Sequence, residues 1–249
     1  MATITITPTF KQVITTRINN KQEILDTLRN IPEEYYKQDN PKANLHIHST
    51  YSDGRLNVNE IIEQAVQKKK KYISITDHDT TEHLKEVEKY NKYLIENGLT
   101  VISGVELSTK NKGKNVHILV YGADYNDKRL NKICNDIKNG KKIDTIKAIK
   151  ELSKDYVTVL AHPIYAFNLG LKKMIMKFKE AGLSGIEVYY PYNDTDKYLK
   201  LANQKGGFIY KNLAKIRETI VKPEEFAKKT GLIATGGKDT HNKNLDYSY

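Results

Sequence analysis

The chain has 249 residues, which is long enough to bury a full core and is a common length for an α/β barrel in one domain. Its 41 Lys and Arg exceed its 30 Asp and Glu, and the net charge of +11 favours anionic partners such as phosphate esters or nucleic acid. No apolar run is long enough to span a membrane, the first residues lack the apolar core of a secretory signal, and the single cysteine, Cys134, cannot form an intrachain disulfide, so we expect a soluble cytoplasmic protein.

The first segment, residues 1–41, carries no chemical motif and is predicted to be an N-terminal extension, with strand-like residues at 4–18 and a short helix at 21–30. Residues 42–249 are predicted to form one larger domain. Short apolar runs in that domain predict seven strands, at residues 43–48, 72–76, 100–105, 116–121, 157–161, 185–190 and 232–236. Helical spacing predicts a helix that begins at the capping box of Asn57 and Glu60, and further helices at residues 82–97, 127–154, 171–181, 194–204 and 223–229.

Two segments depart from the alternation of strands and helices, and one run of lysines needs separate interpretation. Residues 107–115 are polar and contain a glycine, which predicts a hairpin turn. Residues 206–225 could form another barrel helix, a lid or an oligomer contact. The lysines at 68–71 end an amphipathic helix, where cations suit the helix dipole and solvent, so we expect a solvated face there and not a binding patch.

The alternation of strands and helices predicts an α/β fold with a parallel sheet. Residues that commonly bind metals fall at the ends of the predicted strands, and in a barrel those ends share one rim. His46 and His241 are far apart in the sequence and can meet only if the first and last strands are neighbours. We therefore expect a closed or nearly closed barrel.

Six of the seven histidines stand in short motifs with carboxylates beside them. These motifs are His46-Ile47-His48 followed by Ser52-Asp53-Gly54, then Asp77-His78-Asp79, Gly104-Val105-Glu106, His117, Ala161-His162-Pro163 and Asp239-Thr240-His241. Alternate residues of a strand point to the same face, so His46 and His48 can bind one ion together. The recurrence of such residues along the chain predicts a polynuclear metal site and a metal-dependent hydrolase.

Together these motifs resemble the polymerase and histidinol phosphatase (PHP) domain family, and the resemblance extends from Lys42 to the C-terminus. It implies a distorted seven-stranded (β/α)7 TIM-like barrel, a trinuclear metal site and phosphoesterase activity. Residues 76–81 and 186–191 look most like those of small phosphoesterases that act on nucleoside bisphosphates or short oligonucleotides. The resemblance thus implies a phosphorylated small molecule or a short nucleic acid as substrate.

The resemblance also implies the ligands of three divalent ions, among which Glu106 would be the bridging carboxylate. One ion would be held by His46, His48, Glu106 and Asp239, a second by Glu106, His117 and His162, and a third by Asp53, His78 and His241. Nitrogen and oxygen ligands in this mixture suit Mn, Zn or Fe better than Ca or Mg. Of these ligands, Glu106, His78, Asp239 and His241 are expected to be catalytic, with a metal-activated hydroxide attacking phosphorus.

Residues beside the ligands have several open roles. One of Asp77 and Asp79 is expected to orient a histidine ligand, with helix capping by Asp79 as the alternative, and Glu187 could support the site or pair with a lysine. His83 is expected at the surface or at the edge of the substrate site. Lys238 stands where the relatives commonly have Ser and could bind phosphate or form a salt bridge.

Substrate recognition departs from the family pattern. The stretch that in the relatives often carries a cap with a phosphate-binding arginine, residues 122–156 here, is short and contains a single arginine, Arg129. Candidate replacements are Lys172, Lys173, Lys215, Arg217 and Lys238. Two alternatives to a nucleotide phosphoesterase stay open: a histidinol-phosphate phosphatase, and a non-catalytic module that binds nucleic acid or a partner protein. The presence of all nine expected ligands argues against the non-catalytic module. The sequence does not predict the oligomeric state.

Overall fold

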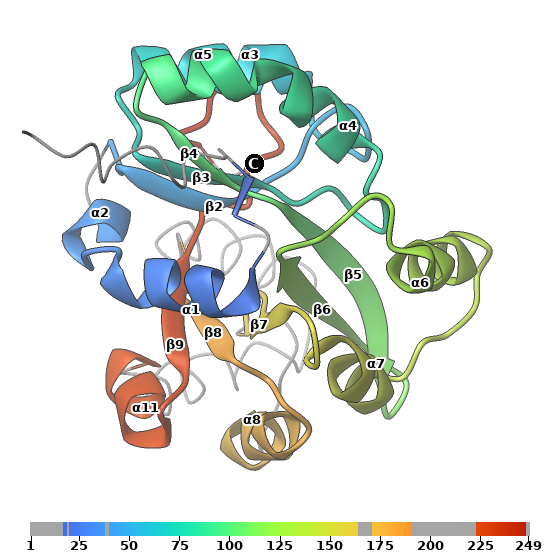
Figure 1. Cartoon of the computed structure of the whole chain (residues 1–249). Helices are drawn as coiled ribbons and strands as arrows, with labels where there is room; N and C mark the ends of the chain where they lie inside the picture. Colours follow the sequence, from blue (N-terminus) through green and yellow to red (C-terminus); the bar gives the residue numbers. More distant parts are fainter. Residues whose placement is uncertain (1–16, 19, 38–39, 164–170, 191–222, 248–249) are drawn as a thin grey trace, which may run out of the picture.

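The computed structural model describes residues 17–18, 20–37, 40–163, 171–190 and 223–247, and their strands form two sheets (Figure 1). The first sheet is parallel and has the order β1-β4-β3-β2, with β1 Arg17–Ile18, β2 Ala43–Ile47, β3 Tyr72–Ile75 and β4 Thr100–Ile102. The second has the order β5-β6-β7-β8-β9, with β5 Gly104–Asn111, β6 Lys114–Tyr121, β7 Val157–Leu160, β8 Gly185–Tyr189 and β9 Ile233–Gly236.

The second sheet is mixed, whereas the alternation of strands and helices predicted a parallel sheet with one hairpin turn. Strands β5 and β6 form an antiparallel hairpin, and β6 also pairs antiparallel with β7, whereas β7, β8 and β9 are parallel. The predicted turn is confirmed but is shorter than residues 107–115, because pairing continues to Asn111 and Lys114. Lys112 and Gly113 make the turn with φ of 49° and 80°, and a glycine meets the second value without steric cost.

Two isolated bridges link the first sheet to segments at the two edges of the second sheet. His78 bridges Glu106 on one side, and Ile47 bridges Thr240 on the other, where the His48 N–H donates to the Thr240 carbonyl at 2.9 Å. The first long strand therefore lies beside the segment that follows the last strand, as the expected meeting of His46 and His241 required. The α/β class is confirmed. The described strands form a four-stranded and a five-stranded sheet, so a single seven-stranded barrel is not what the pairing shows.

The helices predicted within the described residues are present, but two of them are divided. The described helices are α1 Lys21–Asn30, α2 Glu34–Lys37, α3 Val58–Gln67, α4 His83–Val87, α5 Asn91–Glu96, α6 Lys128–Lys138, α7 Thr145–Leu152, α8 Leu171–Glu180 and α11 Pro223–Thr230. The 3-10 segment η1, Glu88–Tyr90, separates α4 from α5, and a new N-cap at Asp144 begins α7 after a break in the predicted helix 127–154. The capping box of Asn57 and Glu60 is confirmed. The helix predicted at 194–204 lies outside the described residues.

Helices cover the sheets because each buries one apolar face. Helix α3 buries Val58, Ile61 and Ile62 against the first sheet, in one cluster with Leu245. Helix α1 places Ile24 and Leu28 in a cluster with side chains of β2, β6, β7 and β9. Full burial of such a side chain contributes about 1.5 to 3 kcal/mol. The helix predicted within the extension 1–41 is therefore part of the common core, although the domain boundary at residue 41 stays a prediction.

Of the lysines at 68–71, Lys69 and Lys71 are exposed as expected, but Lys68 is half-buried and Lys70 is buried, which corrects the expectation of a solvated face for these two. Lys70 is 2% exposed, and its ammonium donates to Asp246 Oδ1 at 2.8 Å and to the Pro41 carbonyl at 2.9 Å. Lys68 donates to the other oxygen of the same carboxylate at 2.5 Å. These contacts fasten the C-terminal segment to the amino ends of β2 and β3.

Candidate metal centre

The first group of candidate ligands is built on β2. His46 lies on this strand and His48 directly follows its last residue, both are buried, and their ring centroids are 5.1 Å apart. Their Nε2 atoms lie 2.9 and 3.1 Å from Glu106 Oε2, and 3.4 and 3.1 Å from Asp239 Oδ1. The four side chains thus converge as the sequence predicted for the first ion.

Glu106 is at the centre of the histidines. Its oxygen Oε2 lies 2.9 Å from His46 Nε2, 3.1 Å from His48 Nε2 and 3.4 Å from His78 Nδ1. The other oxygen, Oε1, lies 3.0 Å from both His117 Nδ1 and His162 Nε2. Burial alone would raise the pKa of Glu106, but the surrounding histidines, His46 first, hold that pKa well below its ordinary value. A shared carboxylate in this position has the geometry that a bridging ligand requires.

The second group contains Glu106, His78 and His117. The expected set was Glu106, His117 and His162. In the structure His78 takes the place of His162 in this group, and His162 contacts Glu106 without being part of the group. Glu106 and His117 lie within the β5–β6 hairpin and not at the carboxyl ends of strands, which corrects the prediction for these two. In the antiparallel register Ser108 is opposite His117 and Leu119 is opposite Glu106, so both ligands lie on one face of the hairpin.

The third group contains His48, Asp53, His78 and His241. His241 Nε2 lies 3.1 Å from Asp53 Oδ1, and His78 Nε2 lies 3.9 Å from Asp53 Oδ2. The Asp53 side chain is 57% exposed, whereas the His48 side chain is fully buried. The three expected ligands therefore lie together with His48, on the part of the cluster that is open to solvent.

The buried atoms of the cluster have the character of an ion-binding site. Among the described residues, His48 Nε2, His78 Nδ1 and Asp239 Oδ1 are buried and make no hydrogen bond of good geometry. Buried polar atoms without such bonds are costly to the fold, and a bound cation would satisfy them. Imidazole nitrogens and carboxylate oxygens in this arrangement fit Mn, Zn or Fe.

Backbone strain is concentrated at the same place. Asp79, His162 and Asp239 have φ of 52°, 25° and 49°, in the left-handed region that residues other than glycine rarely adopt. Such conformations persist only where the surroundings hold them, and they are common at functional sites.

Two residues support the ligands directly. Glu187 lies with Oε1 3.1 Å from His46 Nδ1, and Oε2 accepts the His162 N–H at 2.8 Å. A carboxylate at Nδ1 favours the tautomer whose Nε2 lone pair points at the cluster. This contact confirms that Glu187 supports the site. The Tyr190 hydroxyl donates to Asp239 Oδ2 at 3.0 Å, a role that the sequence did not indicate.

Asp77 and Asp79 hold backbone segments in place. Among the hydrogen bonds of the described residues, neither carboxylate accepts one from His78. Asp77 accepts from the Ser49 N–H at 2.7 Å and from the Ser49 and Ser52 hydroxyls, each at 2.6 Å. Asp79 accepts the Ser108 N–H at 2.8 Å. Asp77 thus holds the loop that follows His48, and Asp79 attaches its own segment to β5.

The expectation for His83 is wrong. His83 is 0% exposed and its Nε2 lies 3.0 Å from the Ile75 carbonyl and 3.1 Å from the Gly104 carbonyl, so it is neither at the surface nor at an edge open to substrate. Helix α4 begins at His83 and turns this first residue inward, onto the strands. A substrate phosphate cannot reach it in this structure.

Lys238 is half-buried, and its backbone N–H donates to Asn44 Oδ1 at 2.9 Å. Burial is the main cause that lowers the pKa of Lys70. The positive charges of Lys68 and Lys238 lower that pKa further. Lys172 and Lys173 are exposed on α8, while Lys215 and Arg217 lie outside the described residues.

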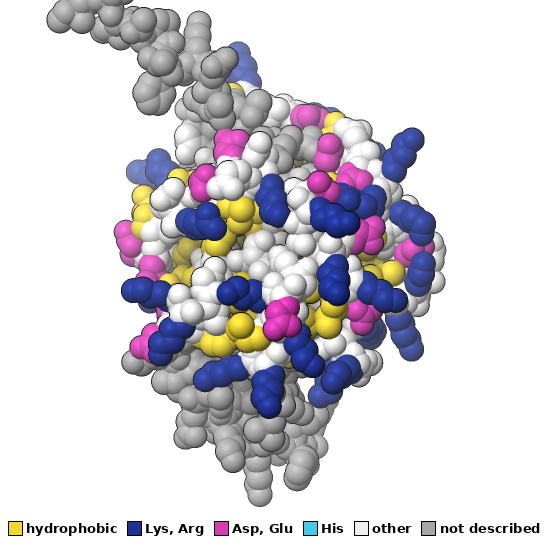
Figure 2. All heavy atoms as spheres, turned by 60° about the horizontal axis from the view of Figure 1, so that its bottom comes forward, with side chains coloured by type: hydrophobic (Ala, Val, Ile, Leu, Met, Phe, Trp, Pro, Cys, Tyr) yellow, Lys and Arg dark blue, Asp and Glu magenta, His cyan; other side chains and the backbone are white. Residues whose placement is uncertain are grey.

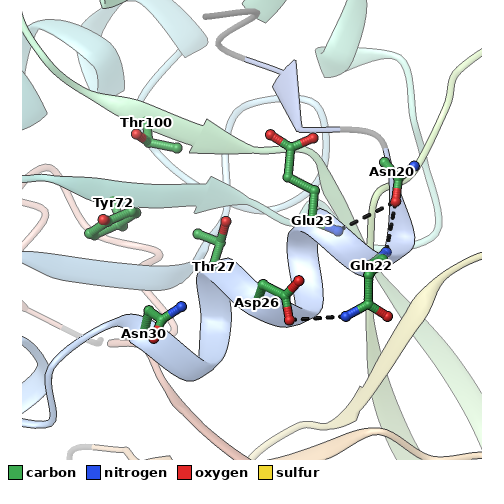
Figure 3. Close-up of a pocket in the computed structure, with 8 residues that line it drawn as sticks. All are labelled: Asn20, Gln22, Glu23, Asp26, Thr27, Asn30, Tyr72 and Thr100. Atoms are coloured by element: carbon green, nitrogen blue, oxygen red, sulfur yellow. Dashed lines mark hydrogen bonds between the residues drawn. The ribbon is translucent and has the colours of Figure 1, made fainter. Parts of the chain in front are cut away.

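Other surface features lie away from the cluster. A cavity of about 670 Å³ opens between α1 and the first residues of β3 and β4, at the opposite end of these strands from the histidines, and Asn20, Glu23, Asp26, Tyr72 and Thr100 are among the residues that line it (Figure 3). On the face shown in Figure 2, Lys and Arg side chains are spread out and separated by acidic, hydrophobic and uncharged surface. Neither feature brings metal ligands together.

The sequence matches the family model of the PHP domain over residues 44–230, and the chain therefore belongs to the PHP domain family. It is 35% identical over 92 residues to the phosphoribosyl 1,2-cyclic phosphate 1,2-diphosphodiesterase of Eggerthella lenta, covering 36% of this chain and 34% of that protein. It is 38% identical over 78 residues to the 5'-3' exoribonuclease of Haemophilus influenzae, covering 31% of this chain and 27% of that protein. The alignments thus span about a third of the curated relatives.

Two solved structures share the fold. An amidohydrolase from Chromobacterium violaceum superimposes with a TM-score of 0.63 and 19% identity, covering 84% of this chain and 90% of that protein. A protein of Bifidobacterium adolescentis assigned as a metal-dependent phosphoesterase superimposes with a TM-score of 0.58 and 16% identity, covering 81% and 88%. At these identities the likeness supports the fold alone. Within the described residues, no helix is both long and apolar enough to traverse a bilayer.

Proposed function

We propose that this PHP domain is a metal-dependent phosphoesterase that hydrolyses phosphate esters of nucleotides or short oligonucleotides. The observation that carries the proposal is the convergence of five histidines on the two oxygens of the buried Glu106. Family membership supports the class of reaction. The names of the two curated relatives, one acting on a cyclic phosphate and one on RNA, support a phosphorylated small molecule or short nucleic acid as substrate.

The nine residues predicted as ligands would hold three divalent ions of Mn, Zn or Fe, with Glu106 shared between two of them. Bound ions of this kind lower the pKa of coordinated water and stabilise the negative charge that develops on a phosphoryl group. Catalytic roles are proposed for Glu106, His78, Asp239 and His241. We also propose that the two bridged sheets correspond to the distorted seven-stranded barrel that the family resemblance implies.

The protein's own residues set the geometry and the access to this centre. Glu187 holds the His46 ring, and Tyr190 holds the Asp239 carboxylate, so neither ligand has to reorient when an ion binds. Exposure divides the cluster: the His46 and His48 side chains are fully buried, while the side chains of His78 and His117 are 24% and 26% exposed and that of Asp53 is 57% exposed. A substrate phosphate would therefore approach from the side of Asp53, His78 and His117.

The test is hydrolysis by purified protein reloaded with Mn²⁺, with an aryl phosphate and a nucleoside 3',5'-bisphosphate as substrates. We expect activity that a chelator abolishes and Mn²⁺ restores, and loss of most of it in His78→Ala and Asp239→Ala. Parallel assays with histidinol phosphate separate the nucleotide phosphoesterase from a histidinol-phosphate phosphatase. Activity that survives both substitutions would contradict the assignment of the site.

A further inference from the structure

His83 occupies the seam between the two sheets. Its Nε2 faces the carbonyl of Ile75, the last residue of β3, and the carbonyl of Gly104, the first residue of β5. Its Nδ1 is buried and lies 3.2 Å from Asp77 Oδ2. The ring thus contacts the first sheet, the second sheet and a carboxylate of the site in one place.

The atoms around the ring constrain its protonation. Both carbonyls on Nε2 are acceptors, so Nε2 must carry a hydrogen. The nearest partner of Nδ1 is a carboxylate oxygen, which already accepts the Ser49 hydroxyl at 2.6 Å. A neutral ring would direct the Nδ1 lone pair at that oxygen, whereas an imidazolium would direct an N–H at it. The hydrogen-bonding groups therefore favour the cation.

Desolvation acts in the opposite direction. Burial is the largest influence and holds the pKa of His83 below its ordinary value, although Asp77 and the two carbonyls act to raise it. The acceptors that face both ring nitrogens, and not this pKa, are the evidence for the cation. The Tyr51 ring, with its centroid 6.4 Å away, packs edge-on and accepts no proton. Asp77 has a pKa below its ordinary value because its hydrogen bonds and His83 outweigh its own burial, so it provides the counter-charge.

From Asp77 the contacts lead to the ligands. Asp77 accepts from Ser49 and Ser52, which belong to the loop that carries Asp53, and the Ser52 hydroxyl is 3.5 Å from His48 Nδ1. On the other side of the ring, Gly104 is two residues before Glu106. A connected set of contacts therefore runs from the loop ligands through Asp77 and His83 to the strand that carries Glu106.

We propose that His83 is a positioning residue: a buried imidazolium that, paired with Asp77, fixes the Ser49–Asp53 loop relative to Glu106. In this role it sets the geometry of the open group formed by His48, Asp53, His78 and His241 without touching an ion or the substrate. The inference rests on the proposed metal site for its consequence, but the state of the His83 ring can be measured independently of any metal.

The first measurement is ¹⁵N NMR of the metal-free protein labelled at histidine, at pH 7. We expect the two ring nitrogens of His83 to have the shifts of an imidazolium. In Asp77→Asn, an amide can donate to Nδ1 where the carboxylate accepted, so His83 should become neutral. A neutral His83 ring in the unsubstituted protein would overturn the proposal.

The second measurement is a Mn²⁺ titration of His83→Gln, which can still donate to the carbonyls but cannot carry the charge. We expect its weakest Mn²⁺ site to lose about 10-fold in affinity, as seen when groups behind metal ligands are removed. The matched control is Leu84→Ala, a buried neighbour on the same helix without a contact to Asp77 among the hydrogen bonds and ion pairs of the described residues. Equal Mn²⁺ affinity in the two variants would refute the positioning role, whereas a protein that binds no Mn²⁺ at all would refute the proposed function and leave the NMR result standing.

Discussion

The two ends of the parallel strands both bury charged side chains, but they satisfy them differently. At the amino ends, Lys70 is enclosed by the carboxylate of Asp246 and the carbonyl of Pro41, so donors and acceptors match. Near the carboxyl ends of β2 and β3, Glu106 of the β5–β6 hairpin faces five imidazoles, and the nearby Asp239 Oδ1 and His48 Nε2 are buried without a well-formed hydrogen bond. A buried charged side chain can therefore have a purely structural role as readily as a functional one. Ligand atoms that converge without matched donors are what distinguish the functional end.

The largest effect is expected at the functional end. Glu106→Gln removes the shared negative charge and leaves the histidines in place, so we expect phosphoesterase activity to fall by about 1000-fold or more, equivalent to about 4 kcal/mol. Steady-state kinetics with an aryl phosphate measures the loss. A Glu106→Gln protein with near-normal activity would remove the basis for distinguishing the two ends.

The opposite end should respond in stability and not in chemistry. Lys70→Met leaves Asp246 with Lys68 as its partner at the end of the strands, and we expect the free energy of unfolding to fall by about 3 kcal/mol. Urea denaturation measures this change, and activity per folded molecule should be unchanged. If Lys70→Met lost activity while keeping its stability, the assignment of this end as purely structural would be wrong.

The pH dependence of the metal-free protein should show the strain of the functional end. Although burial opposes it, the carboxylates of Asp239 and Glu106 beside Nε2 raise the pKa of His48 to about 9 from an ordinary value of 6.5. Stability from this proton is fully present below pH 6.5 and is lost as the pH rises through about 9. The pKa values of His46 and His162 are also raised, so they act in the same direction.

We therefore expect the free energy of unfolding of the metal-free protein to decrease from pH 6.5 to 9, on the order of 2 kcal/mol, because the shift is shared among coupled groups. Mn²⁺ affinity should rise over the same range, since the ligands must lose these protons to bind the ion. Urea titrations and calorimetry at several pH values measure the two slopes. Slopes of the same sign would contradict this explanation.

The smallest effect is expected from the support behind the ligands. Glu187→Gln keeps the size of the side chain but weakens its hold on the His46 Nδ1–H, and we expect about a 10-fold loss of Mn²⁺ affinity. Glu180→Gln, an exposed residue at the end of α8, is the matched control and should leave the affinity unchanged. Calorimetric titration of both variants separates them. An unchanged affinity in Glu187→Gln would reduce its role to packing.

Patterns that are local in the sequence predicted the fold and site well. The alternation in β2 placed His46 and His48 on one face, and the capping box at Asn57 marked the start of α3. Contacts between distant segments were harder. The antiparallel pairing of β6 with β7 was not predicted, because an apolar run does not record the direction of its partner.

His83 and Lys70 show the same limit for single residues. Each stands in a polar segment that resembles a solvated helix end, and each is buried because tertiary packing supplies a carboxylate: Asp77 for His83, and Asp246 for Lys70. The carboxylate partner of Lys70 is 176 residues away in the sequence, so no local pattern could identify it. Tyr190 was missed for the same reason, since its partner Asp239 is 49 residues away.

The most direct test of the central claim is elemental analysis of the purified protein and of Glu106→Gln after both are equilibrated with Mn²⁺ and freed of unbound metal. The convergence of the nine ligands, with Glu106 among them, predicts up to three ions per chain, with a clear loss in the variant because the shared carboxylate is gone. A chain that retains no Mn, Zn or Fe, or a variant that retains as much as the unsubstituted protein, would contradict the assignment of this cluster as a metal centre.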